Sequence, residues 1–508
     1  MAEPQVGTIP GALIAAAQRF GPKPAYVEGE RVLSFADLLA EVESTAAGYA
    51  ALGVSPGDRI CLWAPNSIGW VIAALAVHHA GATLVPINSR YTGHEAADIV
   101  ARTHATLAVV ADGFLGRNQI KELTEAADLP DLREIVDIDA LPAIQRAPGE
   151  ETRARAKAVS PDDVADILFT SGTTGRAKGV LSAHRQTVGV AHAWGGLGGV
   201  TETDRYLVVN PFFHSFGYKV GIVTGLLTGA TLYPVPVFDV AATMALIERE
   251  RITVLPGAPT IYQSLLAAPD RGEHDLSSLR LAVTGAAVVP VVLIERMRDP
   301  APAGLGIDTV VTAFGQTEAV VATMCRDGDS AETVATTCGR AVPGMEARID
   351  GDGPTGELLL RGEYVMLGYL DDPEATAQAI DSDGWLHTGD VGTLDEAGNL
   401  RITDRLKDMY ICGGFNVYPA EVEQTLARMP GISDVAVVGV PDERMGEVGR
   451  AFVVASPGTT GVAETEVIAF ARERLANFKV PRSVVVVDAL PRNPSGKVLK
   501  NELRSRHG

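Results

Sequence analysis

Residues 170–178 read Thr-Ser-Gly-Thr-Thr-Gly-Arg-Ala-Lys, and the rest of the chain is interpreted outward from this stretch. Gly172 and Gly175 let the backbone approach a ligand closely, while hydroxyl groups, backbone N–H groups and the ammonium of Lys178 suit a polyphosphate. The spacing excludes a Walker A loop, which has four residues between its first glycine and a Gly-Lys-Ser/Thr triplet. The alternative is an ordinary surface loop, because clusters of serine, threonine and glycine are typical of loops.

Short apolar runs alternate with helical patterns on both sides of this loop. Residues 165–169 predict a buried strand that leads into the loop, and a helix is expected after His184. Further strands are expected at 60–63, 83–86, 107–110 and 253–255, and helices after Ser34, at 68–79, at 95–103 and from Pro259. The alternation predicts an α/β fold with a large N-terminal domain of layered mixed and parallel sheets and helices.

The pattern changes near residue 400. Pro419 suits the first turn of a helix, and the glutamates after it favour a helix N-terminus. Strands are expected at 435–438 and 451–454, with a helix between Glu464 and Leu475. The sequence therefore predicts an N-terminal domain of residues 1–404 and a small α+β C-terminal domain of residues 405–508.

Composition excludes several classes of function. The net charge of −20 argues against a general nucleic-acid binder, because affinity for the phosphate backbone needs clustered lysine and arginine. The four cysteines form no CxxC pair, so neither a zinc knuckle nor a disulfide framework is expected, which fits the reducing cytoplasm. The longest apolar stretch, 68–77, is too short to span a bilayer, so membrane insertion is not expected.

Three further motifs carry groups that suit a nucleotide. Residues 313–318, Ala-Phe-Gly-Gln-Thr-Glu, offer an aromatic ring for a purine, a hydroxyl for a phosphate and a carboxylate for a hard cation, or else form a capped turn. Asp390 follows a glycine and can accept hydrogen bonds from a ribose diol. Lys497 lies on a loop that Pro491 and Pro494 stiffen.

Together and in this order, these motifs closely resemble those of the adenylate-forming superfamily of acyl-CoA synthetases, peptide-synthetase adenylation domains and insect luciferases. The resemblance extends from about residue 11 to about residue 500. It implies an enzyme that activates a small-molecule carboxylic acid with ATP and Mg²⁺ and transfers the acyl group to CoA. Such chemistry brings two anions together, so the site must supply positive charge.

The resemblance implies an ATP site assembled from several motifs. The β- and γ-phosphates are expected on Thr170, Ser171, Gly172, Thr173, Thr174, Gly175 and Lys178, and adenine beside Gly285, Ala286, Ala287, Phe314 and Gly315. Thr317 would contact the α-phosphate, and Glu318 with Thr170 would hold Mg²⁺. Asp390 and Arg405 would bind the ribose hydroxyls, and Lys497 would reach the carboxylate and the α-phosphate during adenylation.

The C-terminal domain of this superfamily is mobile. Its rotation withdraws the lysine and brings a glycine-bearing strand to the tunnel through which the thiol of CoA arrives. Lys407 matches the hinge position, and Gly413 and Gly414 would approach the pantetheine arm.

The acyl pocket is expected to be lined by Trp194, His214, Gly217, Tyr218, Val320 and Val321. His214 ends the motif Pro211-Phe212-Phe213-His214, and it would gate the pocket or orient the carboxylate, unless it is a purely structural histidine. With Lys219 as the one possible inward cation, the pocket favours a bulky hydrophobic acid over an amino acid.

Three segments narrow the resemblance further. Residues 210–219, 333–340 and 407–419 look like those of a family of bacterial ligases that attach CoA to the indane-propionate fragment of degraded sterol rings. The acid of that family carries two fused, oxygenated rings on a propionate arm. A few side chains can change such specificity, so a medium- or long-chain fatty acid or an aryl acid is the alternative substrate.

Two other readings of the function stay open. One is the loading of a carrier protein in trans, and the other is an adenylate-binding protein that has lost turnover. The presence of Lys178, Glu318 and Lys497 argues against the second reading. The expected protein is a cytoplasmic monomer or homodimer.

Overall fold

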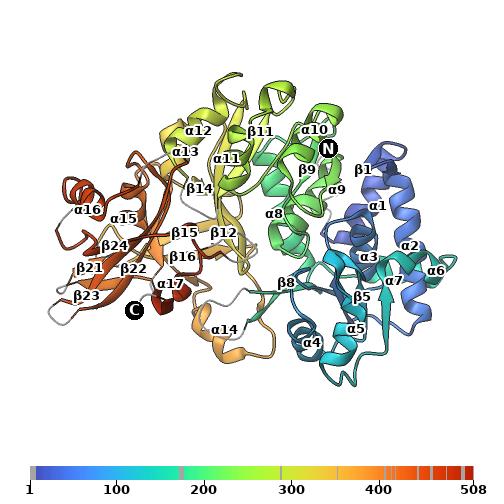
Figure 1. The fold of residues 1–508 in the computed structure, drawn as a ribbon. Coiled ribbons are helices and arrows are strands. Elements are labelled where there is room, and N and C mark those ends of the chain that lie inside the picture. Colours follow the sequence, from blue (N-terminus) through green and yellow to red (C-terminus); the bar gives the residue numbers. More distant parts are fainter. Residues whose placement is uncertain are drawn as a thin grey trace.

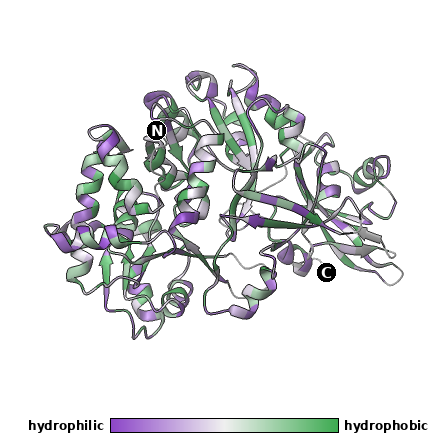
Figure 2. Ribbon diagram, turned by 180° about the vertical axis from the view of Figure 1, so that it is seen from behind, coloured by the Kyte–Doolittle hydropathy of each residue, from purple (hydrophilic) through white to green (hydrophobic). Residues whose placement is uncertain are grey.

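The computed structural model describes residues 7–170, 177–285, 289–351, 353–405, 408–412, 415–417, 419–442, 445–457, 461–475, 477–492 and 498–506. The helices near the N-terminus lie at one end of the molecule and the C-terminal elements lie at the other end (Figure 1). Hydrophobic residues are concentrated on the inner strands and helices, and hydrophilic residues on the outer turns (Figure 2). The predicted α/β fold is confirmed.

One sheet carries the 170–178 loop. Its strands, in spatial order, are β17 (Gly368–Tyr369), β8 (Gly179–Ala183), β7 (Val164–Phe169), β4 (Thr83–Pro86), β3 (Arg59–Trp63), β5 (Leu107–Val110) and β6 (Glu134–Asp137). The pairs from β7 to β6 are parallel, whereas β8 runs antiparallel to both β7 and β17. The helices that follow these strands are α3 (Ile68–His79), α4 (Gly93–Arg102), α5 (Gln119–Ala126), α6 (Leu141–Ile144) and α7 (Glu150–Ala158).

A second group of strands carries the predicted adenine and acyl sites. It comprises β2 (Arg31–Ser34), β1 (Pro24–Glu28), β10 (Thr231–Pro234) and β9 (Arg205–Val208), and beside them β11 (Leu281–Gly285), β12 (Thr309–Gln316), β13 (Ala319–Met324) and β14 (Arg340–Ala341). Its helices are α1 (Ile9–Phe20), α2 (Phe35–Ala51), α8 (His184–Leu197), α9 (Thr224–Thr228), α10 (Val240–Glu250), α11 (Pro259–Ala267), α12 (Val291–Arg298) and α13 (Ala331–Thr336).

The strand expected at 253–255 is the clearest difference from the sequence-based prediction. Only Val254 forms bridges there, to Tyr206 on one side and to Leu281 on the other. These two bridges are both parallel and join β9 to β11 through residue 254, so this segment links two sheets instead of forming a strand of its own.

The remaining strands are mostly antiparallel. One sheet contains β15 (Met345–Asp350), β16 (Gly356–Gly362), β18 (Leu386–Leu394) and β19 (Leu400–Arg405), and α14 (Pro373–Ala379) lies between β17 and β18 in the sequence. The C-terminal sheet contains β21 (Phe415–Val417), β20 (Tyr410–Cys412), β23 (Gly446–Ala455), β22 (Ile432–Asp442) and β24 (Ser483–Val486), with α15 (Pro419–Leu426), α16 (Glu464–Arg472) and α17 (Lys500–Arg506).

Buried hydrophobic residues form separate clusters on the two sides of residue 405. The main cluster runs in sequence from Ile9 to Leu400, and another joins residues between Tyr410 and Leu503. Each cluster removes apolar surface from water independently, which is the physical basis for expecting two folding units. The boundary at 404/405 and the hinge at Lys407 stay predictions, and Lys407 lies outside the described residues.

Candidate active site

The 170–178 loop connects β7 to β8. Where the loop leaves the two strands, Phe169 of β7 is paired with Gly179 of β8. Thr170 N donates to Lys178 O over 2.9 Å, and Lys178 N donates to Thr170 Oγ1 over 3.2 Å. The two ends of the loop are therefore closed on each other by hydrogen bonds. Ser171, Gly172, Thr173, Thr174 and Gly175 lie outside the described residues.

A tyrosine that the sequence analysis did not select joins two predicted site residues. Lys178 Nζ lies 4.6 Å from the ring centroid of Tyr369, and the Tyr369 hydroxyl donates to Glu318 Oε1 over 2.9 Å. Tyr369 belongs to β17, which pairs with β8 just after the loop. The sequence held no signal for the contact between Tyr369 and Glu318, because Tyr369 lies 51 positions beyond Glu318 in the chain.

Thr317 and Glu318 occupy the turn between β12 and β13, since Gln316 is paired with Ala319. The turn is tightly packed: a Cβ on Gly315 would lie 2.3 Å from Val321 N. Val321 has φ of +48°, a conformation that a β-branched residue adopts only under strain. The structure thus presents the Glu318 carboxylate at the tip of a constrained hairpin.

The predicted adenine residues lie where β11 and β12 end side by side. Gly285 is paired with Ala313, and a Cβ on Gly285 would lie 2.7 Å from Ala313 O, so this close approach requires glycine. Phe314, the next residue, is half-buried against the main cluster. Ala286 and Ala287 lie outside the described residues.

Asp390 lies on β18 opposite Arg405 of β19, and it is 3% exposed. Its backbone N donates to Thr388 Oγ1 over 3.1 Å. The preceding Gly389 has φ of +68°, which glycine adopts without steric cost, and its N donates to Glu357 Oε1 over 3.0 Å. Strand pairing therefore places the backbones of both predicted ribose-binding residues side by side. Lys497, Gly413 and Gly414 lie outside the described residues.

His214 lies at the start of the helical segment that leads into the predicted acyl pocket. Its Nδ1 accepts a hydrogen bond from Phe216 N over 3.2 Å, which places the proton of the neutral ring on Nε2. The residue is solvent-accessible yet surrounded by protein atoms, and this desolvation lowers the pKa of His214 below its ordinary value. In the neutral ring, Nε2–H is therefore the donor that His214 offers.

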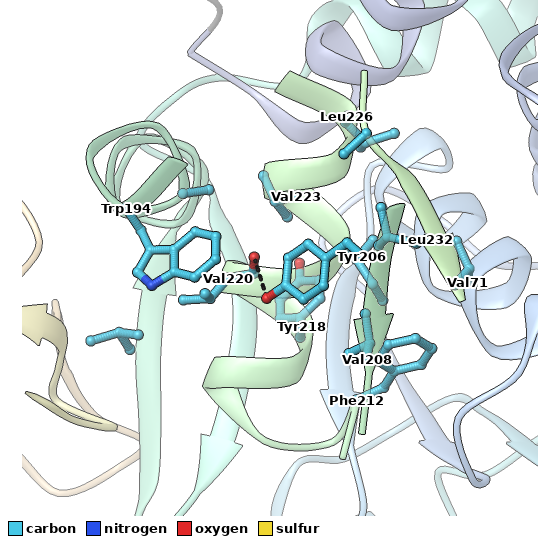
Figure 3. Packing of buried hydrophobic residues seen from close by; sticks show 14 of the residues in the cluster. Val71, Trp194, Tyr206, Val208, Phe212, Tyr218, Val220, Val223, Leu226 and Leu232 are labelled. Carbon is cyan, nitrogen blue, oxygen red and sulfur yellow. Dashed lines mark hydrogen bonds between the residues drawn. The ribbon is translucent and has the colours of Figure 1, made fainter. Parts of the chain in front are cut away.

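Two of the other predicted pocket residues, Trp194 and Tyr218, are packed among buried hydrophobic side chains (Figure 3). Trp194 is fully buried and stacks on Tyr206 with 5.8 Å between ring centroids. Tyr218, in the π-helix Phe216–Val223, is also fully buried, and its hydroxyl lies 2.7 Å from His78 Nε2. Gly217, in the same π-helix, is buried, and so are Val320 and Val321 on β13. In this structure Trp194 and Tyr218 are therefore core residues that expose no side-chain surface to a ligand.

Lys219 is not directed toward an acyl substrate. Its Nζ lies 3.0 Å from Asp166 Oδ1 and donates to Ser182 Oγ over 2.8 Å. The hypothesis of an inward cation at this position is therefore wrong, because a buried carboxylate of the protein already neutralises the charge. The expectation that the pocket favours a bulky hydrophobic acid over an amino acid stays a prediction.

The carboxylate of Glu318 fits a Mg²⁺ ion that is bound jointly by the protein and by the phosphates of a nucleotide. Within the described ranges, no group of three or more His, Cys, Asp or Glu side chains could hold a metal by itself. Mg²⁺ usually binds through one or two carboxylates together with substrate phosphates and water, so a single protein carboxylate can be sufficient. The metal role of Thr170 stays a prediction.

None of the helices in the described part of the chain has the length and apolar character needed to cross a membrane.

A groove of about 550 Å³ lies beside Tyr369, between α14 and β8, and it includes Asp371 and Thr376. It opens to solvent, and Leu181 of β8 is part of its lining.

Comparison with known proteins agrees with this geometry. The sequence model described as "AMP-binding enzyme" matches residues 13–370, and the one described as "AMP-binding enzyme C-terminal domain" matches residues 421–497. Enzymes of this family use ATP and CoA.

Two curated relatives are named "3-[(3aS,4S,7aS)-7a-methyl-1,5-dioxo-octahydro-1H-inden-4-yl]propanoyl:CoA ligase". The relative from Rhodococcus jostii is 58% identical, over 98% of this chain and 99% of its own. The relative from Mycobacterium tuberculosis is 57% identical, over 98% of both chains. The solved structure of ATP-bound MatB from Rhodopseudomonas palustris is 30% identical, covers 99% of both chains and superposes with a TM-score of 0.85.

Both family models and the full-length relatives match this chain, and the predicted resemblance to acyl-CoA synthetases is confirmed. The chain belongs to the AMP-binding enzyme family.

Proposed function

We propose that this chain is an ATP-dependent ligase that joins CoA to a bulky bicyclic propionate of the indane type. The proposed substrate class rests on two ligases that are named for that acid. They are 57–58% identical to this chain over 98% of its length. The apolar side chains of Val320 and Val321, which the resemblance places at the acyl pocket, support a hydrophobic acid. A fatty or aryl acid is the alternative, because the side chains of a pocket can change within a family.

The reaction proceeds in two steps in this proposal. The substrate carboxylate first attacks the α-phosphate of ATP, which forms an acyl-adenylate and releases pyrophosphate. The thiol of CoA then attacks the acyl carbon, which forms the thioester and releases AMP. A water-excluded site is required between the two steps, because the acyl-adenylate is a reactive mixed anhydride.

The residues of the chain have separate roles in the first step. The 170–178 loop and Lys178 hold the leaving pyrophosphate, while Thr317 contacts the α-phosphate. Glu318 holds Mg²⁺, which when bound supplies positive charge to the phosphates. Asp390 and Arg405 hold the ribose, and Gly285 and Phe314 flank adenine. Positive charge at the α-phosphate is the main requirement, since two anions must meet there.

Lys497 and His214 act on the reacting carboxylate in this proposal. Lys497 binds the carboxylate and the α-phosphate during adenylation. His214 donates through Nε2–H, and desolvation favours the neutral ring because it lowers the pKa of His214.

The C-terminal domain supplies the second step. Residues 405–508 turn about the hinge at Lys407, which withdraws Lys497 and brings Gly413 and Gly414 to the pantetheine arm. A hinge of this kind is confined to a few residues that absorb a large backbone change.

The test is a pyrophosphate-release assay on the full chain with free CoA and a panel of acids. The panel contains the bicyclic diketo propionate, a C8 and a C16 fatty acid, and a hydroxycinnamate. The bicyclic acid is expected to give the highest kcat/KM, by at least tenfold. A higher kcat/KM with a fatty or aryl acid would overturn the substrate class, and pyrophosphate release without any acyl-CoA product would favour loading of a carrier protein.

A further inference from the structure

The segment of residues 365–370 holds one side of the candidate ATP site through its backbone. Val365 forms an antiparallel bridge with Ala319, the first residue of β13. Met366 N donates to Glu318 O over 2.8 Å. The backbone of Glu318 is therefore fixed to this segment directly.

The same segment is fixed to the strand that follows the 170–178 loop. Tyr369 is paired with Val180, and Leu370 N donates to Gly179 O over 2.7 Å. Tyr369 N also donates to Thr376 Oγ1 of α14 over 2.9 Å. The backbone of Tyr369 is thus held from two directions, between the turn that carries Glu318 and the strand that follows the 170–178 loop.

The side chain of Tyr369 uses this position to contact both predicted phosphate-site groups. Its hydroxyl donates to Glu318 Oε1 over 2.9 Å, and its ring lies 4.6 Å from Lys178 Nζ. A neutral phenol hydroxyl beside a carboxylate oxygen is the donor of the pair, because the carboxylate can only accept.

We propose that Tyr369 is a positioning residue that orients Glu318 for Mg²⁺ and Lys178 for the phosphates of ATP. This inference rests on the roles proposed above for Glu318 and Lys178. A hydrogen bond to Oε1 fixes the carboxylate plane and leaves Oε2 to face the cation, as partners of metal-binding carboxylates do in general. The ring attracts the Lys178 ammonium without neutralising it, so the full charge stays available to phosphate oxygens.

The first test compares Tyr369→Phe with Tyr364→Phe in the full chain. Tyr364 lies just before the same segment, and its ring packs against Gly189, so its substitution controls for the loss of any hydroxyl nearby. Binding of Mn²⁺ in the presence of α,β-methylene ATP, followed by electron paramagnetic resonance, measures the site without turnover. Tyr369→Phe is expected to weaken Mn²⁺ binding about tenfold, while Tyr364→Phe leaves it unchanged.

Tyr369→Leu separates the two contacts of this residue. Because it removes the ring as well as the hydroxyl, it is expected to weaken binding of the metal-free ATP analogue, which Tyr369→Phe preserves. Equal Mn²⁺ affinity in Tyr369→Phe and the unmodified chain would overturn the proposal.

A double-mutant cycle with Glu318→Gln distinguishes this inference from the proposed function. If Tyr369 acts through Glu318, the double variant binds Mn²⁺ no more weakly than Glu318→Gln alone. Additive losses would show that Tyr369 does not act through Glu318, while the metal role of Glu318 would stand. If Glu318→Gln by itself left Mn²⁺ binding intact, the metal role in the proposed function would fail, and this inference would fail with it.

Discussion

Lys219 and Asp166 form a buried ion pair, with 3.0 Å between Nζ and Oδ1 and side chains that are 3% and 0% exposed. Lys219 belongs to the π-helix that follows His214, and Asp166 belongs to β7, which leads into the 170–178 loop. Asp166 Oδ2 also accepts from Thr187 Oγ1 of α8 over 2.9 Å. The pair thus joins the segment that follows His214 to the strand that precedes the 170–178 loop.

Removing one member of this pair is expected to be costly. Lys219→Met leaves Asp166 buried without its counter-ion, so it should destabilise the fold by about 3–5 kcal/mol. The double variant Lys219→Met/Asp166→Leu should recover most of that loss, because no charge is left uncompensated. Urea denaturation followed by tryptophan fluorescence measures the effect, with Lys121→Met as a control whose side chain is 66% exposed. A single variant as stable as the control would contradict the argument.

Gly315→Ala should distort the turn that presents Thr317 and Glu318. The new Cβ would lie 2.3 Å from Val321 N and 3.0 Å from Ala319 O, and neither backbone atom can move without shifting β13. The substitution is expected to cost about 1–3 kcal/mol of stability. The rate of pyrophosphate release should fall by a larger fraction than the free energy of unfolding. Gly272→Ala is the matched control, because a Cβ there meets nothing within 4 Å. Normal turnover in Gly315→Ala would show that the turn tolerates displacement.

Asp390→Asn tests the predicted ribose contact. Loss of a charged acceptor for hydroxyl groups should raise the KM for ATP by about 10- to 100-fold, with little change in the KM for the acid. Steady-state kinetics with each substrate varied in turn separate the two effects, and exposed Asp383→Asn serves as the control. An equal rise in both KM values would indicate a general distortion of β18.

Stability should fall as the pH is lowered from 7 to 5.5. Desolvation by burial lowers the pKa of His79 and of His184 from 6.5 to about 4. Between pH 4 and pH 6.5 the unfolded chain binds more protons than the folded chain. The free energy of unfolding therefore rises with pH in this window. Each histidine is expected to contribute about 1 kcal/mol to the loss. Thermal unfolding at several pH values should show a shallower pH dependence for His79→Leu, but not for exposed His192→Leu.

Lys497→Ala should separate the two half-reactions. Adenylate formation, measured by exchange of labelled pyrophosphate into ATP, should be abolished because the charge at the α-phosphate is lost. Thioester formation from a supplied acyl-adenylate and CoA should be spared. The exposed Lys121→Ala controls for loss of a surface lysine. Equal losses in both half-reactions would contradict the assignment of Lys497 to adenylation alone.

The local elements were largely predictable from sequence because their signals are local. The helix expected at 68–79 is α3, Ile68–His79. The helix expected after Ser34 is α2, and the Ser34 hydroxyl accepts from Asp37 N as a cap does. The helix expected at 95–103 begins at Gly93 instead, because Thr92 and Glu95 form a capping box that starts it earlier.

The sequence by itself determined the fold class, the family and the identity of the candidate ATP-site motifs. These features depend on short stretches such as 170–178 and 313–318, whose chemistry is readable without coordinates. The tertiary structure alone decided that Lys219 is neutralised by Asp166 and that residue 254 is a bridge between two sheets. It also decided that Tyr369 connects Lys178 to Glu318. Such relationships join residues far apart in the chain, and strand pairing and burial, which no local pattern encodes, bring them together.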